Sequence, residues 1–214
     1  MRRYPQPELL DSLPVDHPDA LHSRRDLILI NRLMGNPRWL RASLAAHHRV
    51  GERVLELGAG TGELARHLRT HAPLIDGIDR VPAPPGWPAS ARWHQADIAQ
   101  FADWQDYPVV MGNLILHHFS ADALGALGAA WAPRARLLIF NEPVRRRYLQ
   151  RIWRLAAPLA GANPVTQHDG HVSIGAGFCA DELPRGLGLD PRLWDWRVTT
   201  TWLGAYRLIA HRRS

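Results

Sequence analysis

Short apolar runs alternate with segments of helical spacing through the middle of the chain. Four runs are rich in Val, Ile and Leu without polar alternation, which is typical of strands covered on both faces. They occupy residues 53–57, 74–79, 109–114 and 137–141. Apolar residues at helical spacing fill residues 63–70, 121–130 and 145–159. This order predicts an α/β fold with a doubly wound, mostly parallel sheet.

Both ends of the chain depart from this alternation. Several early prolines predict an extended first segment, and helical spacing then predicts helices over residues 19–34 and 37–47. At the other end, residues 197–202 and 205–211 have strand character and flank Gly204. They predict an antiparallel hairpin that closes the edge of the sheet.

A glycine-rich turn follows the first predicted strand. Residues 54–68 read VLELGAGTGELARHL, so a glutamate precedes three glycines at the start of a helix. Glycine permits positive φ in a tight turn and lets a ligand lie against the backbone. Ligands of such sheets bind beyond the carboxyl ends of the strands. We therefore expect a cofactor site formed by Glu56, Gly58, Gly60 and Gly62.

The glycine spacing separates two kinds of cofactor. A dinucleotide-binding turn has the spacing G-x-G-x-x-G and would need glycine at the position of Glu63, which disfavours a nicotinamide-dependent oxidoreductase. An acid in the strand followed by G-x-G-x-G strongly resembles motif I of class I S-adenosylmethionine-dependent methyltransferases. The resemblance implies S-adenosylmethionine as cofactor and a Rossmann-like, seven-stranded sheet with additional N-terminal helices.

Acids at the ends of the next strands extend the expected cofactor site. Asp79 ends the second strand, where a carboxylate can accept both ribose hydroxyls; Asp76, earlier in that strand, is a competing choice. After a third strand over residues 91–94, the resemblance implies that Asp97 meets the adenine amino group and that Ile98 lies against the ring.

The segment after the fourth strand carries the candidate catalytic residues. Asn113 ends that strand and is the last expected cofactor contact. Residues 113–120, NLILHHFS, look like the corresponding segment of small-molecule methyltransferases, including the ubiquinone and menaquinone biosynthesis group. They lack the D/N-P-P-Y/F signature of amino methyltransferases that act on DNA bases. His117 or His118 could remove a proton from the acceptor, and only one of the two adjacent side chains is expected to face it. Glu142, after the fifth strand, is a further candidate.

Fewer residues can be identified as contacts of the methyl acceptor. Residues 166–178 contain His168 and His171 among several glycines, which predicts a polar loop that contacts the substrate. We expect no metal there, because no third strong ligand is spaced with the two histidines. In methyltransferases of this class, N-terminal helices commonly cover the cofactor, so some of their side chains are expected to close the pocket. The candidates are Arg25, Asn31, Arg32 and Trp39.

Composition adds a bias toward arginine. The chain contains no lysine, and its formal net charge is +6. Arginines gather between residues 145 and 154, where a solvated helix face is the simplest interpretation. The alternative is docking of an acidic carrier protein, and no nucleic-acid partner is expected.

The same composition bounds the location and organisation of the chain. No apolar run reaches the roughly 18 residues needed to span a bilayer, no secretory signal is visible, and Cys179 is the only cysteine. We therefore expect a cytoplasmic protein without membrane insertion; the oligomeric state stays open. We expect one domain over residues 1–214, with a helical cap (1–49), a cofactor-binding core (50–142) and a substrate side of helices and strands (143–214).

Together these features predict a methyltransferase acting on a small molecule. Transfer to oxygen is favoured over transfer to carbon or nitrogen, in specialised-metabolite or quinone-type biosynthesis. Alternatives are carbon or nitrogen methylation of a carrier-bound or other acceptor, and a non-catalytic subunit that binds the cofactor.

Overall fold

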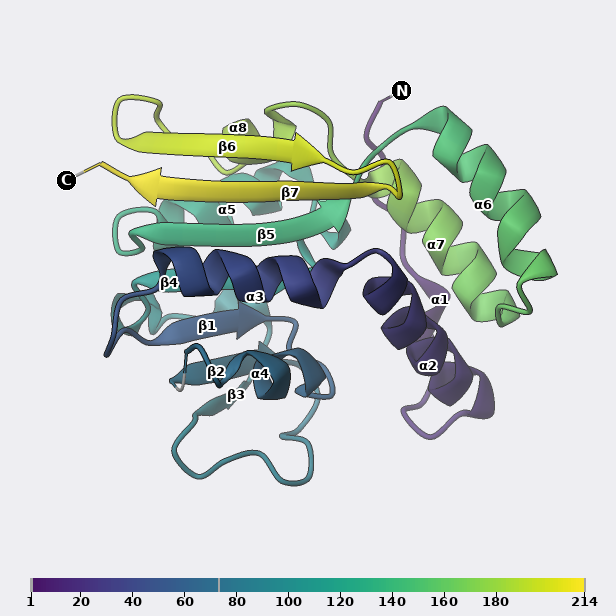
Figure 1. Cartoon of the computed structure of the whole chain (residues 1–214), viewed down its shortest axis with the longest axis horizontal. Coiled ribbons are helices and arrows are strands. Elements are labelled where there is room, and N and C mark those ends of the chain that lie inside the picture. Colours follow the sequence, from purple (N-terminus) through teal and green to yellow (C-terminus); the bar gives the residue numbers. More distant parts are fainter. Residues whose placement is uncertain (1, 73, 214) are drawn as a thin grey trace.

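One seven-stranded sheet organises the chain (Figure 1). The computed structural model describes residues 2–72 and 74–213. The strands are β1 (Val54–Leu57), β2 (Ile75–Asp79), β3 (Trp93–Gln95), β4 (Val109–Asn113), β5 (Leu137–Pro143), β6 (Trp194–Thr200) and β7 (Ala205–Arg212). They lie in the order β3-β2-β1-β4-β5-β7-β6, with β7 antiparallel to both of its neighbours and the other pairs parallel. The predicted doubly wound sheet with a C-terminal antiparallel hairpin is confirmed.

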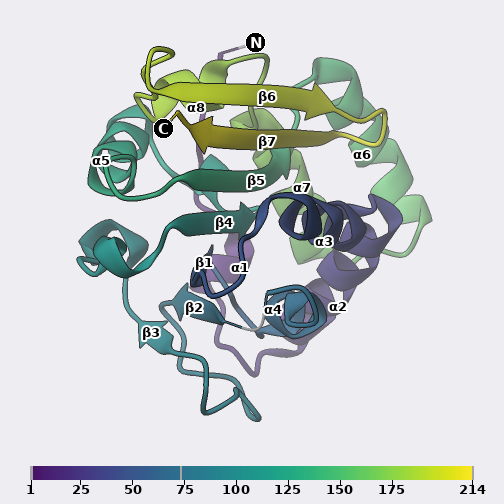
Figure 2. The same cartoon turned by 60° about the vertical axis from the view of Figure 1, so that its left-hand side comes forward.

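Helices cover both faces of this sheet (Figure 2). On one face, α3 (Asn36–His47) and α4 (Glu63–Leu68) bury leucines against the strands. On the other, α5 (Ala121–Trp131) and α8 (Glu182–Gly186) contribute to a second core cluster. The central strands are therefore buried on both sides, which explains their continuous apolar sequence.

Four more helices gather beyond the carboxyl ends of the parallel strands, at the right of Figure 1. They are α1 (Leu9–Ser12), α2 (Pro18–Leu33), α6 (Arg147–Leu159) and α7 (Pro164–Ala176). Because ligands of open α/β sheets bind at this edge, these helices are placed to enclose the site. None of the helices in the described part of the chain has the length and apolar character to cross a membrane.

The prediction of a loop over residues 166–178 is wrong, because α7 occupies most of it. The side chain of Asn163 caps the helix by accepting the backbone N–H of Val165 at 2.8 Å. The glycines of α7 allow close packing against a neighbouring helix and do not form a loop. A Cβ added to Gly170 would lie 2.4 Å from the indole of Trp153 in α6.

Candidate functional site

The turn between β1 and α4 requires its glycines for two separate reasons. Gly58, Gly60 and Gly62 all have positive φ, at +64°, +52° and +66°. An added Cβ would lie 2.7 Å from Ile115 at Gly58, and 2.7 Å from the ring of Trp87 at Gly62. A larger residue would therefore be strained at all three positions and would also clash at Gly58 and Gly62.

A cleft of about 930 Å³ opens beside this turn. Its walls come from the glycine turn, the start of α4, the inner side of α2 and the end of β4, where Asn113 lies. The N-terminal helices thus border the cleft. Arg32 of α2 pairs with Glu63 of α4 at 2.9 Å across its rim.

Glu56 is a buried carboxylate in the lining of this cleft. It is 3% exposed, and its Oε2 has no hydrogen-bond partner among the described residues. Burial raises the pKa of Glu56 to about 8, although the charge of Arg69 opposes the shift. A buried acceptor without a partner is costly, so Glu56 suits a bound group that brings positive charge or N–H donors.

Asp79 is held beside the glycine turn at the end of β2. Its Oδ2 accepts the backbone N–H of Gly60 at 2.8 Å. Asp76 is instead fully buried and binds the guanidinium of Arg53 at 2.7 Å and the hydroxyl of Tyr107 at 2.9 Å. Of the two acids weighed from the sequence, Asp79 is the one that contacts the glycine turn, and its contact with the ribose stays a prediction.

Asp97 and Ile98 follow β3, as predicted. Asp97 caps η1 (Ile98–Gln100) by accepting the backbone N–H of Ala99 at 2.9 Å. Ile98 is buried in a core cluster of the sheet. Their contacts with an adenine ring stay a prediction.

A chain of asparagine side chains links the N-terminal helices to the sheet. Asn31 of α2 accepts hydrogen bonds from Asn36 at 2.8 Å and from Asn113 at 3.0 Å. Asn113 in turn accepts one from Asn141 at 2.8 Å, its partner in the β4–β5 register. The sequence had indicated Asn31 and Asn113 separately, whereas Asn36 and Asn141 gave no signal of their own.

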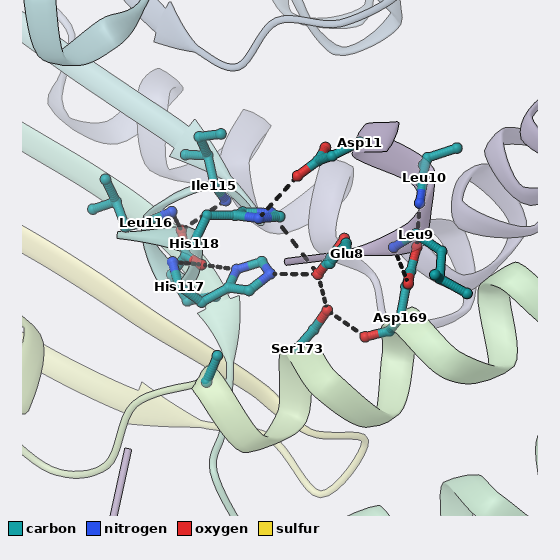
Figure 3. A network of polar contacts seen from close by, with 12 residues as sticks. Glu8, Leu9, Leu10, Asp11, Ile115, Leu116, His117, His118, Asp169 and Ser173 are labelled. Atoms are coloured by element: carbon teal, nitrogen blue, oxygen red, sulfur yellow. Dashed lines mark hydrogen bonds and ion pairs between the residues drawn. The ribbon is translucent and has the colours of Figure 1, made fainter. Parts of the chain in front are cut away.

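A buried ionic network lies beyond the end of β4 (Figure 3). His117, in η3 (Leu116–His118), donates from Nδ1 to Glu142 at 2.7 Å and from Nε2 to Glu8 at 3.3 Å. Burial alone would lower the pKa of His117, but the hydrogen bonds to the two carboxylates outweigh it and raise the pKa to about 9. The same contacts lower the pKa of Glu8 to about 2, against the effect of burial. His117 is therefore a cation between two anions at neutral pH.

Glu142 holds the segment that carries the histidines. It is fully buried, and its carboxylate accepts the backbone N–H groups of Ile115, Leu116 and His117 at 3.1, 2.8 and 3.2 Å. With the imidazole of His117, four donors converge on one side chain. This arrangement suits positioning of η3 more than proton transfer to an acceptor.

No sequence pattern points to Glu8, which comes from the extended N-terminal segment. That segment is tied to the site by Arg3, which donates to the carbonyl oxygens of His117 at 2.9 Å and Phe119 at 2.7 Å. The backbone N–H groups of Leu9 and Leu10 are held by a carboxylate of α7. Two residues more than a hundred positions apart can be in contact without any local sequence pattern that indicates it.

Glu8, His117 and His118 are also the side chains that could hold a metal ion. Their ligand atoms lie within 4.8 Å of one another, and two imidazoles with a carboxylate suit a divalent transition metal. In the structure Oε1 of Glu8 already lies 3.3 Å from Nε2 of His117 and 3.9 Å from Nε2 of His118, and Ser173 also bonds to Glu8 (Figure 3). His168 and His171 are not part of this set.

The remaining substrate candidates lie elsewhere. Trp39 packs against a core cluster, with the guanidinium of Arg207 5.2 Å from its ring centre. His168 and His171, on α7, line a second cavity of about 750 Å³ bordered by α6 and the N-terminal segment. The structure therefore does not bring these three residues to the cleft at the glycine turn, and their contact with a substrate stays a prediction.

The glycine turn, the unpaired Glu56 and the position of Asp79 have the arrangement expected of a class I S-adenosylmethionine site on a Rossmann-like sheet. The residues present fit the cofactor, because Glu56 offers a buried acceptor to its positive charge and the backbone at Gly60 has open space beside it.

Comparisons with known proteins agree with this class. The family model for a methyltransferase domain matches residues 30–171, so the chain belongs to the methyltransferase domain family. No curated protein matches the chain. The chain is an S-adenosylmethionine-dependent methyltransferase.

Solved structures show the same fold at low sequence identity. The plantazolicin methyltransferase BpumL, in complex with a triazolic desmethylPZN analog and SAH, has a TM-score of 0.71 and 10% identity, over 96% of this chain and 93% of that one. Magnesium protoporphyrin IX methyltransferase (ChlM) from Synechocystis PCC 6803, with bound SAM, has a TM-score of 0.56 and 16% identity, over 90% and 84% of the two chains.

Proposed function

We propose that the enzyme methylates a hydroxyl oxygen of a small-molecule acceptor, in specialised-metabolite or quinone-type biosynthesis. The observation that carries this proposal is the state of His118. Its ring lies tilted against that of His117, with 4.3 Å between ring centres, in the segment that follows β4. Ile115, two residues before His117, closes against Gly58 of that turn.

His118 has the properties of a base that takes the hydroxyl proton. Its side chain is 24% exposed, and burial together with the charge of His117 lowers its pKa. It is therefore neutral at pH 7 and able to accept a proton. Carboxylate oxygens of Glu8 and Asp11 lie 3.9 and 3.7 Å from its two nitrogens and would stabilise the imidazolium once it forms.

His117 is a positioning residue in this proposal. It already carries a proton at neutral pH, because its pKa is raised to about 9. Both of its nitrogens are occupied by Glu142 and Glu8, and it is 3% exposed. Its charge keeps the neighbouring His118 neutral. In this proposal His118 is therefore the base and His117 holds it in place.

The protein has two tasks in such a reaction. When bound, S-adenosylmethionine supplies a methyl group on a sulfonium sulfur, which is a good leaving group. The chain must align the acceptor oxygen with that methyl carbon and exclude water. The oxygen's electron pair would form the new C–O bond as the C–S bond breaks, and Nε2 or Nδ1 of His118 would accept the hydroxyl proton.

The acceptor class rests on the similar structures. The similar structures are named for plantazolicin and for magnesium protoporphyrin IX, and we propose a biosynthetic intermediate as the acceptor here as well. Methylation of carbon or nitrogen, a carrier-bound acceptor, and a non-catalytic role as a cofactor-binding subunit remain the competing proposals.

A screen of acceptors tests this function. The purified chain is incubated with methyl-labelled S-adenosylmethionine and a panel of phenols, hydroquinones, amines and activated carbon acids, and the labelled position is located by mass spectrometry. We expect O-methyl products, and we expect His118→Ala to lose turnover while it keeps cofactor affinity. Full turnover in His118→Ala would refute the base, and products labelled only at nitrogen or carbon would refute O-methylation. Cofactor binding without transfer to any acceptor would favour the non-catalytic subunit.

A further inference from the structure

The outermost helix, α6, presents an apolar stripe to solvent. Four of its side chains are 47%, 55%, 72% and 89% exposed, and their spacing places them on one side of the helix. They are Tyr148, Ile152, Leu155 and Leu159. The opposite side of the helix packs on α7, where Trp153 donates to the carbonyl oxygen of Gln167 at 2.9 Å. A contiguous apolar stripe of this kind is unusual on a surface that contacts only water.

Arginines border the stripe. Arg147, Arg151 and Arg154 are exposed, and none of them forms an ion pair within the part of the chain that the structure describes. The chain has no acidic residue between Glu142 and Asp169. Positive charge on this surface is therefore not balanced locally.

The arginine run predicted from the sequence needs one correction. Arg145 does not belong to this surface, because it precedes α6 and is 6% exposed. Its guanidinium donates to the carbonyl oxygen of Gly177 at 2.9 Å and to Glu182 at 2.5 Å. The exposed arginines of this segment begin at Arg146.

The turn between β6 and β7 adds a tryptophan beside the start of α6. Trp202 is 82% exposed and Leu203 is 40% exposed. The next residue, Gly204, accepts the backbone N–H of Val144 at 2.8 Å and lies against Leu149 of α6.

We propose that α6 and the β6–β7 turn dock on an anionic lipid bilayer, with α6 lying in the plane of the interface. Basic amphipathic helices of this composition bury their apolar side roughly 5–10 Å into the headgroup and acyl boundary. The stripe would enter that boundary, while the long arginine side chains reach back to lipid phosphates. Trp202 has the residue type that prefers the membrane interface. This inference concerns a surface and does not depend on the acceptor proposed above.

Two other occupants fit this surface less well. A second copy related by twofold symmetry would bring the arginines of two α6 helices together, and neither helix carries an acid to pair with them. An acidic carrier protein would pair with the arginines. However, the arginines flank an apolar stripe, and that layered order matches anionic headgroups above acyl chains.

Vesicle flotation of the full chain tests the proposal. Vesicles contain phosphatidylcholine alone or phosphatidylcholine with phosphatidylglycerol, at low and physiological salt. We expect binding to the anionic vesicles, weakened by salt, and at least tenfold weaker binding to the neutral ones. The double variant Leu155→Ser/Leu159→Ser should lower the affinity at least tenfold. Arg147→Gln/Arg151→Gln should lower it and flatten its salt dependence.

A matched control uses exposed leucines of another helix. Leu29 and Leu33 of α2 are 58% and 69% exposed, so Leu29→Ser/Leu33→Ser makes the same chemical change at two exposed leucines elsewhere. This variant should float like the wild type, and all variants should keep their unfolding temperature and their affinity for S-adenosylmethionine. The proposal is overturned if the wild type does not float, if neutral vesicles bind equally, or if both leucine pairs matter alike. It is also overturned if light scattering shows a dimer that Leu155→Ser/Leu159→Ser dissociates.

Discussion

Nδ1 of His117 donates to Oε2 of Glu142 at 2.7 Å, in the core at the carboxyl ends of β4 and β5. Glu142 is the penultimate residue of β5, and His117 lies in the turn after β4. The bond therefore fixes the turn to the neighbouring strand. It also sets the charge on His117, and through that charge the protonation of His118.

Replacement of Glu142 tests this link. Glu142→Gln keeps the size of the side chain but removes the charge that four donors share. Because breaking a buried ion pair leaves a charge without compensation, we expect the free energy of unfolding to fall by about 3 kcal/mol. Urea denaturation measures it. Asp106→Asn, which breaks the exposed pair with Arg92, is the control and should cost under about 1 kcal/mol. Equal losses of unfolding free energy in the two variants would show that Glu142 stabilises the fold no more than an exposed ion pair does.

Stability should depend on pH through Glu8 and His117. The pKa of His117 is raised from 6.5 to about 9, so its stabilisation is full below pH 6.5 and is lost as the pH rises through about 9. The pKa of Glu8 is lowered from 4.5 to about 2, so its contribution is present above pH 4.5 and is lost as the pH falls through about 2. The network is therefore strongest between pH 4.5 and 6.5.

Denaturation at pH 5.5 and 9.5 measures this effect. The wild type should lose on the order of 3 kcal/mol over that interval from this network, following the shift of His117. Glu8→Gln removes one of the two carboxylates and should make the loss smaller. A wild type and a variant with the same pH dependence would show that Glu8 does not hold the charge of His117.

The glycine turn should tolerate substitution only where space exists. Gly58→Ala adds a Cβ 2.7 Å from Ile115 at a residue with positive φ, so we expect lost stability and strongly reduced cofactor affinity. Gly86 also has positive φ, at +75°, but nothing lies within 4 Å of its added Cβ. Gly86→Ala should therefore pay only the backbone cost of about 1 kcal/mol and bind S-adenosylmethionine normally. Calorimetric titration with S-adenosylmethionine measures the affinity of both variants. If Gly86→Ala binds normally and Gly58→Ala does not, backbone strain alone does not explain the loss; equal affinities would contradict a special role of Gly58.

Cofactor binding should release a proton from Glu56. Burial raises the pKa of Glu56 to about 8, so the free protein holds this carboxyl mostly neutral at pH 7. The positive charge of S-adenosylmethionine favours the ionised form, and affinity should rise with pH up to about 8. Titration in buffers of different ionisation enthalpy measures the released proton. Glu56→Gln should abolish it, and a wild type that releases none would contradict the placement of Glu56 at the cofactor.

Features that depend on neighbouring residues were predictable from the sequence. The turn at Gly58 to Gly62 and the acid at Asp79 follow from strand ends, because the carboxyl ends of parallel strands share one edge. The alternation of apolar runs and helical segments is also a local pattern, and it predicted the parallel sheet. Boundaries differed by a few residues, as where α6 begins at Arg147 and not at Arg145.

Features that depend on packing across the chain were not predictable. Gly170 reads as a loop residue, but its lack of a side chain lets α7 meet Trp153 of α6. Glu8 reaches His117 across 109 positions, from a segment without periodic spacing. The apolar stripe of α6 has helical spacing like any core helix, and only the structure shows that it faces outward.

Calorimetric titration of the wild type and of Asp79→Ala with S-adenosylmethionine, S-adenosylhomocysteine and NADH tests the central claim most directly. The wild type should bind the first two and not the third. Asp79→Ala should bind S-adenosylmethionine more weakly by about 1 to 3 kcal/mol, the value of lost hydrogen bonds to a charged acceptor. Binding of NADH alone, or an unchanged affinity in Asp79→Ala, would contradict the assignment of the glycine turn and Asp79 to an S-adenosylmethionine site.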